Sequence, residues 1–150
     1  MELEKEIYTS KFENEVHKAT INLMFTAHWL RNKLAAEFKL YGLTPEQYNV
    51  MRILKGKFPE KMCVKDIGRR MIEKNSNVPR ILDRLVRKEL ITRKQSDEDR
   101  RETECTLTEK GIALLAKVTA HIKEAKSAQI NLDEKTAAVL NEILENLREE

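Results

Sequence analysis

The sequence predicts one mainly α-helical domain of the α+β class, with long helices at both ends and a short β-hairpin between them. Apolar residues recur at helical spacing along most of the 150 residues, and four glycines and three prolines leave few positions that interrupt a helix. One region alternates between apolar and polar residues instead, because "LITRKQ" and "RETECTL" lie on either side of the charged tip "SDEDR". A chain of this length can bury a core without disulfides or metals, so a single domain is expected.

The first long helix is predicted over residues 11–40. Apolar residues recur there at spacings of three, four and seven, at Phe12, Val16, Leu23, Ala27, Leu30, Leu34 and Phe38. A second stripe, made of Ile21, Phe25 and Trp29, widens the apolar surface. A helix that is apolar on more than one side packs against more than one neighbour, so we expect this helix to be shared with a partner chain.

Three helices are predicted between this helix and the hairpin. "LTPEQYNVMRIL" has Thr44 as the N-cap, Pro45 at the first helical position and Gln47 three residues on, which together form a capping box. The stretches "VKDIGRRMI" and "KNSNVPRILDRLVRKE" predict two short helices. Because Pro79 is tolerated only near the first turn, the second of them should begin at about Asn75 or Ser76.

Two helices are predicted after the hairpin. Thr108 is expected to cap the first, with Leu107 and Ile112 at the positions of a hydrophobic staple. Asp133 is expected to open the last helix, which carries an apolar stripe of Leu140, Ile143, Leu144 and Leu147.

The charge is distributed unevenly along the chain. The net charge is only +3 at pH 7, but lysine and arginine outnumber aspartate and glutamate by 13 to 7 in residues 61–101. In residues 130–150 the acids outnumber the bases by six to two, and residues 1–20 are also acidic. This pattern favours a basic centre that binds a polyanion, between acidic ends that form a dimer. A solvated surface without a partner is the alternative.

Several classes of protein are not supported by the sequence. The acidic start "MELEKEIYTS" is unlike a signal peptide, and no apolar run approaches the roughly 20 residues that span a bilayer, which favours a cytoplasmic protein without a membrane partner. Scattered histidines and two distant cysteines predict no metal site, and no cofactor is expected. Phosphate-loop, dinucleotide-binding, nucleophile-elbow and zinc-protease motifs are absent, so no catalytic residues are assigned and an enzyme is not expected.

The helix within "SNVPRILDRLVRK" has an apolar face and a basic face. Val78, Ile81, Leu82 and Leu85 are expected to point inward, which leaves an outward set of Ser76, Asn77, Arg80, Arg84 and Arg87. An α-helix fits the major groove of DNA, where arginine or asparagine can make bidentate contacts to guanine or adenine. We expect the N-terminal residues of this helix to reach base edges and its C-terminal residues to meet phosphates. A solvated face with incidental arginines is the alternative.

The order of these elements and three motifs resemble the MarR family of bacterial transcription regulators. The motifs are "LTPEQYNVMRIL", "VKDIGRRMIEKNSNVPRILDRLVRKELITR" and "DRRETECTLTEKG", and the resemblance covers residues 30–120. It implies a winged helix-turn-helix in a homodimer whose terminal helices interlock and whose two wings straddle double-stranded DNA. It also implies a DNA-binding lobe at about residues 40–108, with dimerisation helices at about 1–40 and 108–150.

The resemblance also assigns roles within the hairpin, which would be the wing. Arg101 matches the family's wing arginine that inserts into the minor groove, and Asp99 matches the acid that steadies it. An arginine is drawn to the enhanced negative potential of a narrow minor groove. Arg100 and Lys94 are then expected to contact DNA from the wing, Arg100 through a phosphate. A surface hairpin with self-neutralising charges is the alternative.

Two positions depart from the family pattern. Pro79 occupies a position where the family more often has a threonine or serine that can touch DNA, so one polar contact is missing. Glu89 stands where a glycine commonly ends the helix in the left-handed conformation, at a cost on the order of 1 kcal/mol. Arg87 and Lys88 partly offset that cost at the negative end of the helix.

A small-molecule site is also implied by the resemblance, because family members often bind small aromatic acids between the dimer region and the DNA-binding lobe. The candidate residues for an aromatic or anionic ligand are His28, Trp29, Arg31, Tyr41 and Tyr48. Alternatively, Trp29 and Tyr48 are core residues and His28 is a satisfied polar residue.

The two cysteines predict different environments. Cys63 lies beside Lys61 and Lys65, a setting that can lower the pKa of a thiol and would suit a redox sensor. Cys105 is expected to be buried, because it shares a strand face with Thr103 and Leu107.

The sequence therefore predicts a sequence-specific DNA-binding transcription regulator. It is expected to act as a homodimer on a pseudo-palindromic operator, as a repressor released by a small-molecule effector. Two alternatives remain: a winged-helix protein whose basic face binds another protein, and a thiol-based redox-responsive regulator.

Overall fold

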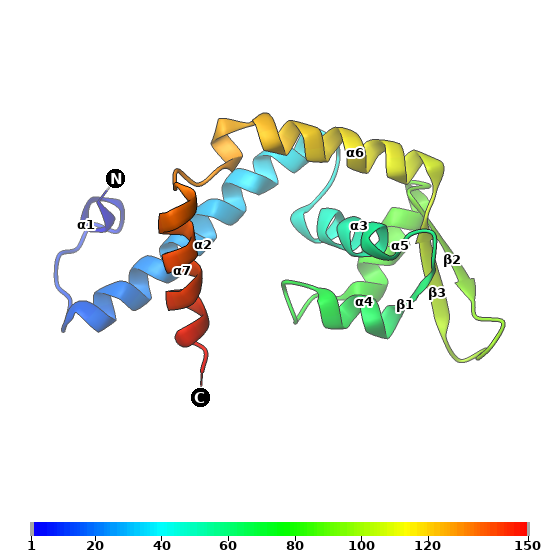
Figure 1. Ribbon diagram of the computed structural model, residues 1–150, viewed down its shortest axis with the longest axis horizontal. Helices are drawn as coiled ribbons and strands as arrows, with labels where there is room; N and C mark the ends of the chain where they lie inside the picture. The colour runs from blue at the N-terminus through cyan, green and yellow to red at the C-terminus, as the bar shows by residue number, and fades with distance from the viewer. Residues whose placement is uncertain (1, 150) are drawn as a thin grey trace.

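The structure, a computed structural model, describes residues 2–149. Figure 1 shows a compact lobe at one end, from which a long helix extends towards the two termini. The compact lobe comprises α3 (Pro45–Lys57), β1 (Met62–Cys63), α4 (Val64–Arg70), α5 (Val78–Arg87), β2 (Ile91–Gln95) and β3 (Thr103–Leu107). The remaining elements are α1 (Leu3–Glu6), α2 (Glu15–Lys39), α6 (Glu109–Glu124), η1 (Lys126–Ala128) and α7 (Glu134–Asn146). None of the helices among the described residues combines the length and the apolar character that crossing a membrane requires.

The predicted hairpin is confirmed, and it belongs to a three-stranded antiparallel sheet of order β1-β3-β2. Strands β2 and β3 pair from Ile91 opposite Leu107 to Gln95 opposite Thr103. The third strand, β1, was not predicted, because the two residues of a strand this short cannot display an alternating pattern. It pairs Met62 with Cys105 and so connects the start of α4 to the hairpin.

The hydrophobic core lies in the compact lobe. Its fully buried side chains come from every helix of the lobe, from the sheet and from α6, and include Val50, Met51, Leu54, Ile67, Met71, Leu82, Leu85, Cys105 and Val118. The inward positions predicted for the helix of residues 78–87 are confirmed, since Val78, Leu82 and Leu85 are buried and Ile81 is partly buried. The burial of Cys105 is confirmed as well.

The predicted caps are present. The side chain of Thr44 accepts a hydrogen bond from the backbone of Gln47 at 3.2 Å, and the Gln47 side chain accepts one from the backbone of Thr44 at 3.2 Å. Thr108 caps α6 by accepting from the Gly111 N–H at 3.0 Å, and Asp133 caps α7. The capping box was therefore correctly predicted from its sequence pattern.

Two predicted helix starts were too early. Helix α2 begins at Glu15 rather than near residue 11, because Asn14 is its N-cap. Helix α5 begins at Val78 rather than at Asn75 or Ser76, because the Asn77 side chain accepts a hydrogen bond from the Arg80 N–H at 3.1 Å. In both cases an asparagine N-cap makes the helix start later than apolar periodicity alone would indicate.

The end of α5 is built as the sequence predicts, with Glu89 in the left-handed region at φ 59°. The Leu90 N–H donates to the Leu85 carbonyl at 3.0 Å and the Glu89 N–H donates to the Val86 carbonyl at 2.8 Å. These two bonds form a Schellman motif, which reverses the chain and buries Leu90 directly before β2. The motif therefore joins α5 rigidly to the hairpin.

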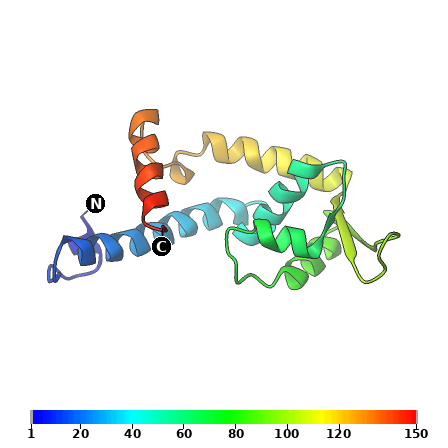
Figure 2. The same cartoon turned by 60° about the horizontal axis from the view of Figure 1, so that its bottom comes forward.

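Helix α7 stands apart from the compact lobe, as Figures 1 and 2 show. It contains no buried residue. The large apolar side chains of Val139, Leu140 and Ile143 in α7 and of Leu147 at its C-cap are exposed, and Val16, Leu23 and Met24 of α2 are exposed as well. A single chain thus leaves two apolar helix surfaces uncovered at this end of the molecule.

Gly111 lies where α6 approaches the end of α5, and a Cβ atom at this position would lie 2.0 Å from the Leu90 carbonyl oxygen. We expect Gly111→Ala to lower the free energy of unfolding by about 2 kcal/mol or more, because backbone atoms would have to move. Gly56→Ala is the matched control, since nothing lies within 4 Å of its added methyl group in α3. The control should stabilise the protein slightly. Urea unfolding followed by circular dichroism measures both, and equal effects would contradict this account of Gly111.

Candidate nucleic-acid interface

Helix α5 presents a basic face to solvent. Arg80, Arg84 and Arg87 are exposed, while Leu82 and Leu85 on the opposite side are fully buried. Arg80 and Arg84 border a surface groove of about 430 Å³ between α5 and the start of α3. Arg84 and Arg87 border an adjoining groove of about 440 Å³, to which Lys39 and Lys88 also contribute. The basic residues thus line one continuous surface along α5.

Lys39 and Lys88 were missed by the sequence analysis. Lys88 lies next to the predicted stripe, but Lys39 comes from the end of α2 and reaches this surface only through the fold. The exposed Lys65, Arg69 and Arg70 on α4 were also missed. Their position on the helix before α5 was the available signal, because the first helix of a helix-turn-helix crosses the DNA backbone.

The predicted residues at the start of α5 have structural roles. Asn77 is the N-cap, so its side-chain amide oxygen accepts a hydrogen bond from the Arg80 N–H. A bidentate contact to adenine needs that oxygen as an acceptor, whereas the amide NH₂ makes no hydrogen bond within residues 2–149 and can donate to a base. The expectation that Asn77 belongs to the helical face is therefore corrected. Ser76 is partly buried, and its N–H donates to the Glu73 carbonyl at 3.1 Å.

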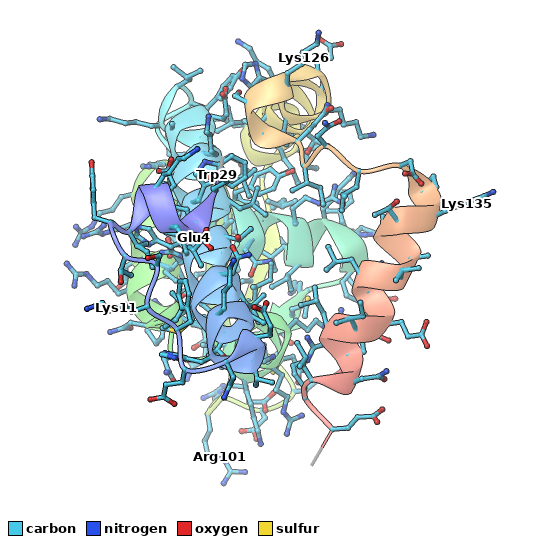
Figure 3. The ribbon with its side chains drawn as sticks, turned by 90° about the vertical axis from the view of Figure 1, so that its left-hand side faces the viewer. Glu4, Lys11, Trp29, Arg101, Lys126 and Lys135 are labelled. Carbon is cyan, nitrogen blue, oxygen red and sulfur yellow. The ribbon has the colours of Figure 1, made fainter. Side chains whose placement is uncertain are left out.

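The tip of the hairpin holds Arg101 in place through Asp99. The Arg101 guanidinium donates to both carboxylate oxygens of Asp99 at 3.2 Å, and its backbone N–H donates to the same carboxylate at 3.0 Å. These bonds hold the pKa of Asp99 below its ordinary value. The Arg101 side chain is nevertheless 91% exposed and extends beyond the rest of the molecule in Figure 3. Lys94 and Arg100 are also exposed on the hairpin.

Ser96 supports this tip and was missed by the sequence analysis. It is buried, its hydroxyl donates to Glu104 at 3.0 Å, and the same oxygen accepts from the backbone of Glu98 and Asp99 at 3.3 and 3.4 Å. A serine directly before an acidic turn was the available signal, because serine side chains often accept hydrogen bonds from backbone N–H groups two or three residues later.

Helix α5 and the hairpin are also joined by an ion pair between Asp83 and Arg93. Asp83 is exposed on α5, and Arg93 lies on β2. Together with the Schellman motif, this pair fixes the orientation of the hairpin relative to the basic face. A rigid site can therefore place Arg80 and Arg101 on one ligand at the same time.

The five residues proposed for a small-molecule site do not line one cavity. His28 and Arg31 border a pocket of about 470 Å³ between α2, α3 and the connection from α4 to α5. Trp29 borders a separate pocket of about 170 Å³ beside α1. Residues 28 and 31 share a helix face, whereas residue 29 is rotated by about 100° from residue 28.

Tyr41 and Tyr48 lie outside that pocket, towards α6. The Tyr48 ring stacks on Phe38 with a centroid distance of 4.4 Å, and its hydroxyl is 3.1 Å from the Thr119 hydroxyl. Tyr41 packs edge-on against His121 with a centroid distance of 5.3 Å. The grouping of all five residues is thus corrected, since these two tyrosines hold α6 against α2 and α3.

The pocket of about 470 Å³ has an apolar lining and a charged rim. Leu30, Leu34 and Met71 belong to the lining. On the rim, Arg31 forms ion pairs with both Glu46 and Glu73. The hydrogen bond that Arg31 donates to Glu46 raises the pKa of Arg31. Burial alone would raise the pKa of Glu46, but backbone hydrogen bonding and Arg31 together hold it below its ordinary value.

Both cysteines are free thiols. Cys105 is buried, and burial raises its pKa to about 11, so this thiol is inert at neutral pH. Cys63 is partly buried at the start of α4. The neighbouring Lys61 ammonium lies 3.4 Å from the Glu104 carboxylate and is thereby engaged by an acid. The proposed redox role of Cys63 stays a prediction.

These elements define the class of the protein. Two short helices, α4 and α5, are followed by a hairpin that carries an exposed arginine at its tip, which is the arrangement of a winged helix-turn-helix. The MarR family model matches residues 43–103, which contain α4, α5, β2 and the tip of the hairpin and end at the start of β3. Over these residues the chain is similar to the MarR family. Members of this family are transcription regulators rather than enzymes.

Individual relatives agree with this assignment. The chain is similar to the HTH-type transcriptional regulator MhqR of Bacillus subtilis, with 36% identity over 75 residues. That alignment spans half of this chain and half of the relative. The crystal structure of a MarR transcription factor from Planctomyces limnophilus matches with a TM-score of 0.70 and 26% identity, over 91% of this chain and 98% of the other.

A third relative shares the fold. The structure of a mutant MarR from E. coli complexed with operator DNA matches with a TM-score of 0.78 over 93% of this chain and 100% of the other, at 18% identity.

The cap at Asn77 generates a prediction on stability. Asn77→Ala should lower the free energy of unfolding by about 1 kcal/mol, because the Arg80 N–H loses its partner. Asn77→Asp should change it little, since aspartate is an equally good cap. Asn75→Ala, in the same connection, is the control and should be close to neutral. Thermal unfolding followed by circular dichroism compares the three, and an alanine effect of equal size at both positions would show that Asn77 is not a cap.

Proposed function

We propose that this protein is a sequence-specific DNA-binding transcription regulator. The observation that carries the proposal is the joint presentation of Arg80, Arg84 and Arg87 on α5 and Arg101 on the hairpin by one rigid lobe. The presence of operator DNA in the structure of the E. coli relative supports it. A DNA target would place the protein in the cytoplasm.

The contacts are divided between the two elements. Arg80 in the first turns of α5 reaches base edges in the major groove, with Asn77 as a donor beside it. Arg84 and Arg87, further along the helix, approach phosphates. Arg101 enters the minor groove, while Arg100 and Lys94 neutralise the backbone.

Three substitutions separate these contacts. Arg80→Ala should cost about 1–3 kcal/mol on the best site and much less on random DNA, because a lost base contact reduces discrimination. Arg100→Ala should weaken binding to all duplexes alike and make the log-affinity against log-salt slope shallower by about one unit. Arg101→Ala should lose affinity most where the flanks are rich in A·T pairs and the minor groove is narrow. Fluorescence anisotropy titrations across a salt series measure all three.

Lys126→Ala is the control for these titrations, because Figure 3 shows Lys126 at the opposite end of the molecule from Arg101. The DNA site is first selected from random duplexes with the parent protein. If the three arginine variants remain folded and bind both selected and scrambled DNA as the parent does, the basic face serves a different partner, such as another protein.

We further propose that the protein acts as a homodimer on a pseudo-palindromic operator. The uncovered apolar residues of α7 and α2 support this, because a second copy would cover both surfaces by symmetry. The compact lobe, at about residues 40–108, then binds DNA, while residues 1–40 and 108–150 form the dimer. A two-fold dimer would place two copies of α5 about one DNA turn apart, or roughly 34 Å.

Truncation after Ala128 tests the dimer. Because α7 contains no buried residue within its own chain, its removal should leave the compact lobe folded while the dimer dissociates. Sedimentation velocity at micromolar concentration should give a dimer for the full chain and a monomer for the truncated chain, with unchanged circular dichroism per helical residue. A full chain that sediments as a folded monomer would refute this part of the proposal.

The regulator most simply acts as a repressor that a small molecule releases. The pocket of about 470 Å³ supports an effector site, because it lies between α2 and the compact lobe, where an occupant could change the angle between them. Its apolar lining suits a small aromatic molecule. An anionic ligand would have to displace Glu46 or Glu73 from Arg31, so a neutral ligand is favoured over the expected aromatic acid.

A further inference from the structure

Helix α2 is attached to the compact lobe at two separate points. Near its end, Phe38 is buried and stacks on Tyr48 of α3 with an interplanar angle of 24°. Seven residues earlier, about 10 Å along the helix axis, Arg31 forms its ion pairs with Glu46 and Glu73. Within residues 2–149, these are the ion pairs that link α2 to the compact lobe.

Between these two points Leu34 is partly buried against the core of the lobe, but a space remains beside it. The pocket of about 470 Å³ lies there, lined by Leu30 and Leu34 from α2 and by Pro45 and Met71 from the lobe. A helix held only at this end, by Phe38 and by the contacts of Glu37 with His121 of α6 and with Ser127, could tilt into this space. The second attachment at Arg31 therefore determines the angle between α2 and the compact lobe.

The two carboxylates that bind Arg31 belong to the elements that orient α5. Glu46 lies in the first turn of α3, and Glu73 lies in the connection between α4 and α5. The Glu73 carbonyl accepts the Ser76 N–H at 3.1 Å, one residue before the Asn77 cap. A force on the Glu73 side chain is thus transmitted over a few bonds to the start of α5.

The Arg31 ion pairs contribute little to folding stability. The Arg31 side chain is 42% exposed and the Glu73 side chain 51% exposed, so water screens their attraction. Their geometry is nevertheless specific, because one planar guanidinium binds two carboxylates from different elements through different nitrogens. An interaction of this kind can select an angle without adding much to the free energy of unfolding.

We propose that Arg31 is a positioning residue that sets the angle between the dimerisation helix α2 and the compact lobe, and thereby the half-site spacing that the dimer accepts. The inference rests on the proposed function, since it requires a dimer that reads two half-sites. Each lobe turns about its Phe38 attachment, so a change of angle moves the two α5 helices relative to each other. It leaves the contacts within one half-site unchanged.

The test uses duplexes that carry the inverted repeat selected by the parent protein, with the spacer between half-sites shortened by one base pair, unchanged, or lengthened by one or two. The parent should prefer one spacing by about tenfold or more over its neighbours. Arg31→Gln should reduce this preference by about threefold to tenfold, because the lobes can then adopt several angles. The effect of base changes within a half-site and the unfolding temperature should stay as in the parent.

Two further comparisons isolate the ion pairs. Lys110→Gln removes the same charge and an exposed ion pair, with Glu89, which does not involve α2, and it should keep the parent's spacing preference. Glu73→Gln should also widen the range of half-site spacings that the dimer binds. The double variant should accept no wider range of spacings than Arg31→Gln alone, because Arg31→Gln already removes the ion pair that Glu73→Gln removes.

The outcomes distinguish this inference from the proposed function. If the parent selects no inverted repeat, the proposed function fails and the inference fails with it. If the parent prefers one spacing and Arg31→Gln prefers it equally, only the inference is overturned. An Arg31→Gln variant that loses base discrimination or unfolds at lower temperature, with its spacing preference unchanged, would overturn the inference in favour of a purely structural role.

Discussion

The burial of Leu82 and Leu85 fixes the rotation of α5, and the placement of the basic residues follows from it. Both side chains are fully buried in the core of the compact lobe. A rotation of the helix by one residue, about 100°, would bury a charged side chain without a partner, which costs several kcal/mol. The same burial determines where the chain leaves the helix, because the Leu85 carbonyl accepts the Leu90 N–H. The hairpin therefore begins at a defined point, and Arg101 is placed relative to Arg80 by the core rather than by contacts between the two arginines.

Sequence patterns predicted the features of this site that depend on neighbouring residues. Apolar spacing predicted the inner face of α5, alternation predicted the hairpin, and the caps at Thr44, Thr108 and Asp133 followed from residue type. Features that depend on distant residues were missed. Arg31 and Glu73 are 42 residues apart, and no local pattern relates them. The predicted start of α5 was wrong for a different reason, because an asparagine two residues before a proline is compatible both with a cap and with a helical position. The pocket grouping failed because the resemblance implied a region of the fold but not the direction of each side chain, and Trp29 turns away from His28 and Arg31.

Asp99 at the hairpin tip preorganises the Arg101 side chain for binding. An exposed arginine side chain loses considerable rotamer freedom when it enters a narrow groove, and Asp99 restricts that freedom before binding. The carboxylate also attenuates the positive charge, so part of the attraction to phosphate is lost. Ser96 accepts hydrogen bonds from the backbone N–H groups of Glu98 and Asp99, which fixes the acidic turn and keeps Asp99 in place beside Arg101. The Asp99 pKa is held below its ordinary value, and protonation would release Arg101 only in acid. At neutral pH the tip therefore presents Arg101 as an ordered cation.

The pocket of about 470 Å³ and the Arg31 ion pairs both lie between α2 and the compact lobe. A ligand in the pocket could therefore change the free energy of DNA binding by changing the angle between these two parts. A ligand changes the angle between α2 and the compact lobe only if it binds one angle more tightly than another. A molecule that fills the space lined by Leu30, Leu34 and Met71 without touching Arg31 would stabilise the existing angle, because it adds contacts on both sides of a fixed gap. One that draws Arg31 away from Glu46 or Glu73 would release the second attachment of α2 and admit other angles. Whether an occupant strengthens or weakens operator binding therefore depends on its interaction with Arg31, and not on its fit to the apolar lining alone.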